Sequence, residues 1–357
     1  MNPYITNSLL PFIVSAGVAT LVLVYFTPVA REIGLVDHPT ERKRHEQDIP
    51  LIGGIGIVLS FYLSLLLAPF GLGEFRYILF GMGILFIIGV LDDHQDISAG
   101  IKFGVQVLAA SIFVAGGTVV TGIGDIFNWA DGNLQGLGQL STVLTVVAIV
   151  GLVNAFNFID GHDGLSGSML LVTMLVIAYL CGINEIWKNQ YIVLLFLTSV
   201  LVFLVFNWPG LVSQRRQVFL GDAGSMMLGM ILAYMLIDLS ERPVPVLKST
   251  SAPWLVGLPL IDMISVIVFR LTQKQSITKP DRRHIHHLLV DLGFSKTQNL
   301  ITLVGVHCLF VGVGLVGTIF QIPDWVLFWS MFPMAIVYCF ICRRLAYKIK
   351  SRVPISR

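Results

Sequence analysis

The chain is poor in charged side chains. Charged residues make up 12% of its 357 residues, about half of what is typical of a soluble domain. Hydrophobic residues make up 55%, and the mean hydropathy is +0.82. This composition leaves too few polar side chains to cover a soluble enzyme, and a net charge of +2 excludes the basic surface of a nucleic-acid-binding protein. We therefore expect an integral membrane protein without a nucleic-acid partner.

Cysteines and common catalytic motifs are also scarce. The four cysteines all lie in apolar stretches, which indicates apolar filling and no disulfide framework. The chain contains no P-loop sequence G-x-x-x-x-G-K-[ST], no nucleophile elbow G-x-S-x-G and no zinc motif H-E-x-x-H. Because the first basic residue is Arg31, we expect no cleaved signal peptide and a first apolar run that stays in the membrane.

Long apolar runs are what the chain does have. A helix of roughly 20 residues crosses the hydrocarbon core of a bilayer. Runs that approach this length and do not alternate with polar residues predict helices and not the strands of a membrane barrel. Eleven such runs cover 8–30, 51–70, 77–91, 102–120, 140–156, 168–183, 190–207, 218–238, 252–271, 299–320 and 324–342. The sequence therefore predicts an all-α polytopic protein, a single membrane domain with about eleven transmembrane helices.

Basic residues predict how the chain is oriented. With the N-terminus outside and the C-terminus in the cytoplasm, all lysines and arginines except Arg76, Lys188, Arg242 and Lys248 fall on the inner side. Most histidines and several aspartates fall on that side too. We therefore expect the active-site face to be built from the cytoplasmic loops 31–50, 92–101, 157–167, 208–217 and 272–298.

Two adjacent carboxylates, Asp92 and Asp93, directly follow the third apolar run. Neighbouring carboxylates at a membrane boundary repel each other and cost desolvation energy. A divalent cation or a basic substrate group between them would offset both costs, and the alternative is a solvated helix end. Lys102, at the entry of the next run, is within reach of this pair, unless it only extends its ammonium group to the membrane surface.

Oxygen-rich side chains end the fifth apolar run. Asn154, Asn157 and Asp160 recur at three-residue spacing, and Asp163 follows between glycines. Mg²⁺ prefers such hard oxygen ligands together with water and phosphate. Asp222 opens another run within Gly221-Asp222-Ala223-Gly224, where it could approach a phosphate or serve only as a helix N-cap.

A cationic cluster lies in the longest loop, where Arg282, His284, His286 and His287 stand within six residues. Arginine and histidine suit the oxygens of a diphosphate, whereas a Zn²⁺ site is the rival interpretation. A smaller cluster in the first inner loop is Arg42-Lys43-Arg44-His45, of which Arg44 and His45 are the candidate substrate contacts. They could attract a phosphorylated lipid or merely set the topology. Asp262 lies inside an apolar run and should face protein, although the sequence does not indicate its role.

Together, these residues favour phosphoryl transfer between a soluble nucleotide donor and a lipid phosphate. Oxygen ligands for a divalent cation and cationic side chains for a diphosphate are expected on one face. The embedded body would let a lipid acceptor arrive from the bilayer. Such a transfer exchanges one phosphoanhydride for another, so it needs no ATP, and catalysis would rest on positioning and charge neutralisation.

At this point the motifs resemble a known family, the polyprenyl-phosphate N-acetylhexosamine-1-phosphate transferases. The resemblance runs from about residue 31 to 342 and is most similar to the WecA branch. It is carried in order by Pro50-Leu-Ile-Gly53-Gly54, Asp92-Asp93-x-x-Asp96, Asn154-Ala-Phe-Asn157-x-x-Asp160-Gly-x-Asp163-Gly, Phe219-Leu-Gly-Asp222-Ala-Gly-Ser and His284-Ile-His286-His287. The resemblance implies transfer of a sugar 1-phosphate, GlcNAc-1-phosphate above all, from a UDP-N-acetylhexosamine to undecaprenyl phosphate, with release of UMP.

The resemblance also implies residue roles. It implies a bacterial inner-membrane enzyme that starts O-antigen, enterobacterial common antigen or another envelope polysaccharide. Asp222 and Asn157 would hold Mg²⁺, for which Mn²⁺ is an alternative. The residues implied to be catalytic are Asp92, Asp93, Asp160, Asp163 and His284. The residues implied to contact substrate are Lys102, Asn154, Arg282, His286, His287, Arg44 and His45.

Several alternatives remain open from the sequence. The donor could instead be UDP-N-acetylfucosamine or UDP-N-acetylquinovosamine, because the loop that would select the sugar cannot be interpreted. A membrane transporter is a distant alternative, for which Asp262 and His307 are the ionisable residues inside the runs. The sequence does not give the oligomeric state, and a homodimer is one option.

Overall fold

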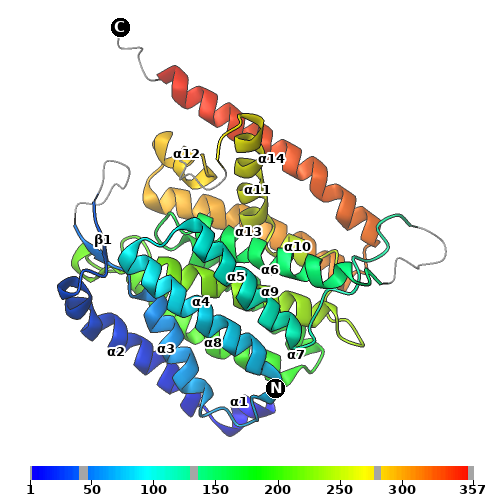
Figure 1. Cartoon of the computed structure of the whole chain (residues 1–357), viewed down its shortest axis with the longest axis horizontal. Helices are drawn as coiled ribbons and strands as arrows, with labels where there is room; N and C mark the ends of the chain where they lie inside the picture. The colour runs from blue at the N-terminus through cyan, green and yellow to red at the C-terminus, as the bar shows by residue number, and fades with distance from the viewer. Residues whose placement is uncertain (1, 40–46, 129–135, 277–282, 353–357) are drawn as a thin grey trace.

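The computed structural model describes residues 2–39, 47–128, 136–276 and 283–352. These residues form a bundle of helices in which a long C-terminal helix crosses one side (Figure 1). The elements in chain order are α1 (Pro3–Asn7), α2 (Leu10–Glu32), β1 (Val36–Asp37), β2 (Ile49–Pro50), α3 (Gly53–Leu65), η1 (Gly73–Phe75), α4 (Arg76–Gln95), α5 (Ala99–Ala115), α6 (Leu140–Ile159), α7 (Leu165–Ile183), α8 (Trp187–Asn207), η2 (Gln214–Arg216), α9 (Gly221–Ser240), α10 (Ala252–Leu255), α11 (Gly257–Thr272), α12 (Ile285–Asp291), α13 (Lys296–Ile319) and α14 (Asp324–Arg352).

Each of the eleven apolar runs coincides with a helix or, for run 252–271, with the pair α10 and α11. Eight helices of the described chain are long and apolar enough to cross a membrane, and α3 and α5 are shorter apolar helices. The all-α polytopic membrane fold is therefore confirmed. The count of eleven crossings and the outward N-terminus stay predictions.

Three local features differ from the predicted loops. In the first inner loop, β1 and β2 pair antiparallel, with Val36 opposite Pro50, because Val36 and Ile49 bury their side chains there. Helix α12 forms within the loop predicted at 272–298. The last helix continues beyond the predicted end of its apolar run at residue 342, as far as Arg352.

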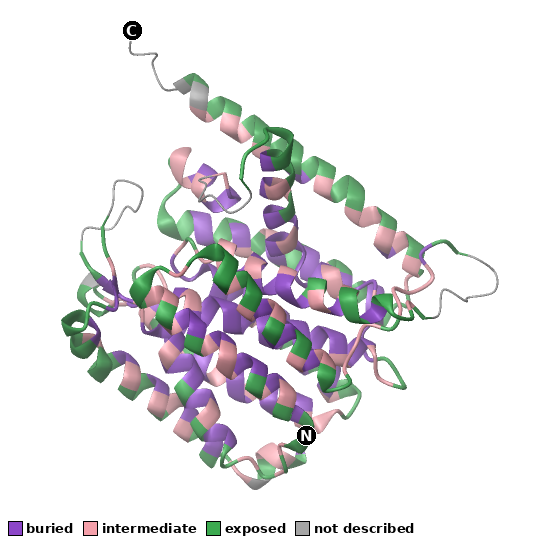
Figure 2. Ribbon diagram, viewed as in Figure 1, coloured by how far each residue is buried: buried purple, intermediate pink, exposed green. Residues whose placement is uncertain are grey.

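Helix α9 is the centre of the bundle. In an 18-residue apolar stretch of α9, 94% of the residues are buried, whereas in the corresponding stretch of α14 only 11% are buried. A helix that is buried on all sides must be surrounded by other helices. Helices α3, α4 and α6 pack around α9, and the buried residues in Figure 2 gather along these helices. The position of α9 therefore fixes where its N-terminal residue Asp222 lies.

Glycines let α3 and α4 approach the first turn of α9 closely. A Cβ added at Gly89 would lie 2.3 Å from the Ala223 Cα, and one added at Gly54 would lie 2.3 Å from the Gly224 nitrogen. No side chain larger than hydrogen fits at either position without a backbone shift. Gly54 and Gly89 therefore serve close packing of α3 and α4 against α9.

A helix break separates α10 from α11 at Val256. The Thr173 hydroxyl donates to the Leu255 carbonyl oxygen at the break (2.6 Å) and lies 3.0 Å from His307 Nε2. His307 is fully buried and also contacts the Met169 carbonyl oxygen. His307, which lies in an apolar run, therefore connects α7 and α13 to the break between α10 and α11.

The close approach of α4 and α9 predicts the effect of a single methyl group. We expect Gly89→Ala to destabilise the protein by about 1–3 kcal/mol, because the new Cβ would overlap the α9 backbone. Thermal unfolding in detergent would measure this loss. Gly83→Ala, in the same helix, is the matched control, because its Cβ would meet only the Tyr62 hydroxyl at 3.8 Å. Equal midpoints for both variants would contradict this account of the packing.

Candidate active site

The candidate site lies where α9 begins. Gly221 adopts φ +74°, and the chain turns there into the helix that carries Asp222. The Asp222 carboxylate accepts a hydrogen bond from Asn157 Nδ2 (3.0 Å) and lies 3.2 Å from Lys102 Nζ. Asn157 lies in the last turn of α6 and Lys102 in the first turn of α5, so three helix ends bring these groups together.

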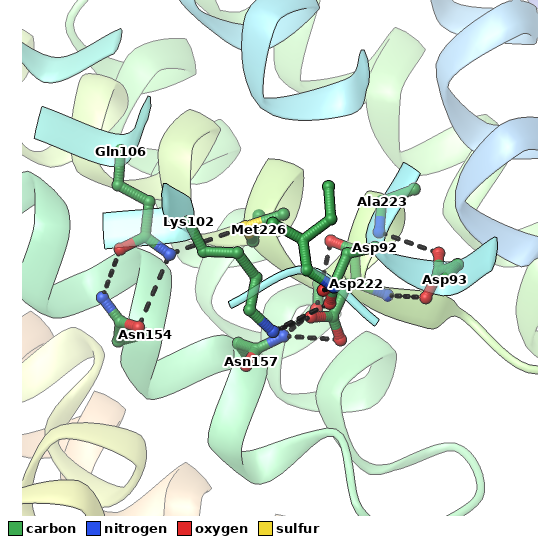
Figure 3. Close-up of polar contacts among 11 residues, drawn as sticks. Asp92, Asp93, Lys102, Gln106, Asn154, Asn157, Asp222, Ala223 and Met226 are labelled. Carbon is green, nitrogen blue, oxygen red and sulfur yellow. Dashed lines mark hydrogen bonds and ion pairs between the residues drawn. The ribbon is translucent and has the colours of Figure 1, made fainter. Parts of the chain in front are cut away.

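Asp92 completes this cluster from the last turn of α4. Its Oδ2 lies 2.8 Å from Lys102 Nζ, and its Oδ1 accepts from the Ile97 backbone N–H at 2.8 Å. Figure 3 shows the Lys102 side chain reaching between Asp92 and Asp222. One ammonium group thus neutralises part of the charge of two carboxylates at the end of the bundle. The sequence predicted that Lys102 is within reach of Asp92, and the structure confirms that contact.

Asp93, the next residue of α4, contacts the backbone at the start of α9. Its carboxylate accepts from the backbone N–H groups of Asp222 (2.7 Å) and Ala223 (3.1 Å) (Figure 3). A carboxylate at a helix N-terminus satisfies unpaired amides and interacts favourably with the helix dipole. Both oxygens are therefore used to hold Asp222. The catalytic role of Asp93 stays a prediction, and the structure adds a positioning role that the sequence did not indicate.

Asn154 and Asn157 have different partners despite their common spacing. Asn157 Nδ2 also bonds to Ser225 Oγ in the first turn of α9 (3.0 Å). Asn154 pairs with Gln106 of α5, donating from Nδ2 to Gln106 Oε1 at 2.7 Å (Figure 3). Sequence reasoning missed Gln106 and Ser225. Gln106, a buried amide inside an apolar run, was the available signal.

Asp160 and Asp163 lie just beyond the end of α6. Asp160 accepts a hydrogen bond from the Ser166 hydroxyl. Burial raises the pKa of Asp160 well above its usual range, and the charges of Asp222, Asp93 and Asp163 raise it further. Asp163 is buried and pairs with Lys296 Nζ at 2.7 Å. Lys296, the first residue of α13, was not among the predicted site residues.

The histidine motif rests on the end of α6. His284 lies 5.7 Å from the Phe158 ring, and its ring stacks on that of His286 at 5.8 Å. A Cβ at Gly161 would lie 2.3 Å from His286 Nε2, so only glycine allows this approach. His287 contacts His286 at 4.1 Å between ring centroids. The structure therefore places the predicted histidines against residues 158–161, beside the carboxylates.

Three predicted substrate contacts, Arg44, His45 and Arg282, lie outside the described residues.

Comparisons with known proteins identify relatives of this chain. The profile of Glycosyl transferase family 4 matches residues 75–240. This segment carries Asp92, Lys102, Asn157 and Asp222. Proteins named undecaprenyl-phosphate α-N-acetylglucosaminyl 1-phosphate transferase align over most of their length. The relative from Yersinia pestis is 32% identical over 90% of this chain and 87% of its own. The one from Pasteurella multocida is 31% identical over 94% of each. A third, from Escherichia coli O157:H7, is 30% identical over 92% and 89%.

The chain belongs to this transferase family.

The family resemblance implies Mg²⁺, and the donor atoms of the site show whether this ion would fit. Within the described ranges, no group of three or more His, Cys, Asp or Glu side chains is arranged to hold a metal ion alone. Mg²⁺ usually binds through one or two carboxylates together with water and substrate phosphates. Asp222 and Asp92 meet that requirement, and Asn157 adds an amide oxygen. The donor set therefore fits Mg²⁺ that binds with a phosphate-bearing substrate.

The capping of α9 by Asp93 predicts a stability effect. Asp93→Ala removes both acceptors from the α9 N-terminus, and we expect a loss of about 2 kcal/mol. Asp93→Asn keeps one acceptor and should lose less. Thermal unfolding in detergent would compare both with Glu74→Ala, which removes an exposed ion pair with Lys188 that should contribute less than about 1 kcal/mol. A midpoint for Asp93→Ala no lower than that of Glu74→Ala would contradict the capping role.

Proposed function

We propose that this protein transfers N-acetylglucosamine 1-phosphate from UDP-GlcNAc to undecaprenyl phosphate and releases UMP. The observation that supports this most directly is the grouping of Asp92, Lys102, Asn157 and Asp222 at the helix ends, within the segment that matches the family profile. The named relatives provide the substrate pair. Within this proposal, the site faces the cytoplasm of a bacterial inner membrane, and the product starts an envelope polysaccharide.

The location of the cluster suits two substrates of different solubility. A nucleotide sugar would arrive from water, while a polyprenyl phosphate would keep its chain in the bilayer. The polar groups lie at the ends of α4, α6 and α9, and the bodies of these helices are long and apolar enough to cross a membrane. Binding at this boundary would bring both phosphates together and exclude most orientations that do not react.

The transfer itself requires little proton chemistry from the protein. An oxygen of the lipid phosphate attacks the phosphorus attached to the sugar, a new phosphoanhydride bond forms, and the bond to UMP breaks. A lipid phosphate is already ionised near neutral pH, so Asp92 need not remove a proton. Lys102, held between two carboxylates, can orient and neutralise phosphate oxygens. Bound Mg²⁺, with Asp222 and Asn157 as ligands, would neutralise the diphosphate and stabilise the leaving UMP. Mn²⁺ would fit the same ligands.

The transporter alternative has no support in the structure. Asp262 and His307, the two ionisable residues noted inside the apolar runs, both take part in local hydrogen bonds. His307 joins neighbouring helices, and Asp262 bonds to the histidine motif. The polar groups of the candidate site instead lie together at helix ends, as a transferase of a soluble donor and a lipid acceptor requires.

Release of UMP tests the proposed reaction. Purified protein with undecaprenyl phosphate, Mg²⁺ and UDP-GlcNAc should form UMP in a lipid-dependent manner. Asp222→Ala should lower the rate at least ~100-fold, because it removes a carboxylate from the phosphate site. Thr173→Val serves as the control, since it removes a buried hydroxyl between α7 and the α10–α11 break, away from this cluster.

Donor choice is tested in the same assay with UDP-N-acetylfucosamine and UDP-N-acetylquinovosamine. A rate with UDP-GlcNAc above both would support it as the donor. Release of UMP from another sugar nucleotide alone would retain the chemistry and contradict the proposed sugar. The absence of UMP with every donor, from protein that unfolds cooperatively, would contradict the transferase proposal.

A further inference from the structure

Asp262 is a buried carboxylate in α11, and its side chain is 1% exposed. An isolated charge at such a site would be strongly disfavoured. Its two oxygens instead meet three groups. Oδ1 accepts from the Ile285 backbone N–H at 3.0 Å and from the Tyr338 hydroxyl at 2.6 Å. Oδ2 lies 2.7 Å from His284 Nδ1. Asp262 therefore joins α11, the start of α12 and the C-terminal helix α14, which lie close together in Figure 1.

This pattern assigns the proton on His284. A carboxylate that accepts two hydrogen bonds on one oxygen is stabilised as an anion, and an anion can only accept at the other oxygen. The His284 Nδ1 must then carry hydrogen and donate to Asp262. Nε2 is consequently the nitrogen left for substrate, and in the neutral ring it carries a lone pair, so it accepts a hydrogen bond from a substrate hydroxyl and does not donate one to a phosphate oxygen. The ring cannot turn freely, because it also lies against Phe158 and is stacked on His286.

We propose that Asp262 is a positioning residue that fixes the tautomer and orientation of His284 for the transfer reaction, and that Tyr338 links α14 to this arrangement. The first part explains why an apolar membrane run contains a carboxylate. The second gives the otherwise exposed α14 a contact with the histidine motif. This inference rests on the proposed function for its kinetic consequence, whereas its structural part can be tested without catalysis.

The substitution Asp262→Asn separates orientation from packing. The amide has nearly the same shape as the carboxylate. Its oxygen should remain where Ile285 N–H and the Tyr338 hydroxyl donate, so its NH₂ group must face His284 Nδ1. Nδ1 then becomes an acceptor and the ring proton moves to Nε2. An aspartate-to-asparagine change with this consequence at a catalytic histidine can lower kcat by up to about 10⁴-fold.

Two measurements on full-length protein test the inference. The first measurement uses ¹⁵N spectra of histidine-labelled protein, in which the signals lost in His284→Ala are assigned to His284. In Asp262→Asn, these signals should change from those of an Nδ1–H tautomer to those of an Nε2–H tautomer. In the UMP assay, kcat should fall at least ~100-fold, while KM for UDP-GlcNAc changes less than ~threefold. The matched control is Thr173→Val, which removes another buried hydrogen-bonding group. Its kcat per folded molecule should equal that of the wild type.

A double-variant comparison tests whether Asp262 acts through His284. In the His284→Ala background, Asp262→Asn should cause no further fall in kcat, because the residue that it positions is gone. The inference would be overturned if Asp262→Asn lowered kcat in the His284→Ala background as much as it does when His284 is present. It would also be overturned if Asp262→Asn left the His284 tautomer unchanged or had the same kcat as the Thr173→Val control.

If Asp262→Asn does not fold, Tyr338→Phe tests the same arrangement from α14. The lost hydrogen bond should lower kcat by roughly threefold to tenfold, and the effect should vanish in the His284→Ala background. Full activity of Tyr338→Phe would contradict the link to α14. Inactivity of the wild type with every donor would contradict the proposed function, while the ¹⁵N spectra would still test the tautomer.

Discussion

The structure depends on how like charges are held together at the end of a membrane bundle. Asp92, Asp93 and Asp222 stand within one small region, where repulsion and desolvation oppose their charged forms. Lys102 neutralises two of them, and the amides that begin α9 bind the third. Close helix packing at Gly54 and Gly89 keeps α9 in place. The position of the candidate site is therefore a consequence of helix ends that are fixed by packing.

A second set of contacts extends the site toward the histidine motif. His284 and His286 rest on the residues that follow Asn157, and Asp262 contacts His284 at Nδ1. Asp92, Asp93 and Asp222 stand on α4 and α9, while the ammonium groups of Lys102 and Lys296 come from α5 and α13 and the imidazole groups come from the start of α12. This separation suits a diphosphate, which needs cationic partners around its oxygens and a divalent cation held by carboxylates.

Much of the fold and the core of the site could be predicted from the sequence. Hydrophobic run length located the helices, and the spacing of Asn157 and Asp160 indicated the oxygen-rich helix end. Long-range partners could not be predicted in the same way. The contact of Asp163 with Lys296 joins residues 133 positions apart, and Asp93 binds amides 129 and 130 positions away. Such pairs follow from three-dimensional packing, so local periodicity gives no signal for the role of Asp93 as a cap or of Asp262 as an anchor.

We propose that the carboxylates around Lys102 are arranged for a divalent cation bound with the donor diphosphate. Electron paramagnetic resonance with Mn²⁺ in place of Mg²⁺ tests this most directly. Protein saturated with UDP-GlcNAc should give a bound Mn²⁺ signal with ³¹P hyperfine coupling, and Asp222→Ala should lose it. An identical coupled signal in Asp222→Ala would contradict the account, because the ion would then bind elsewhere.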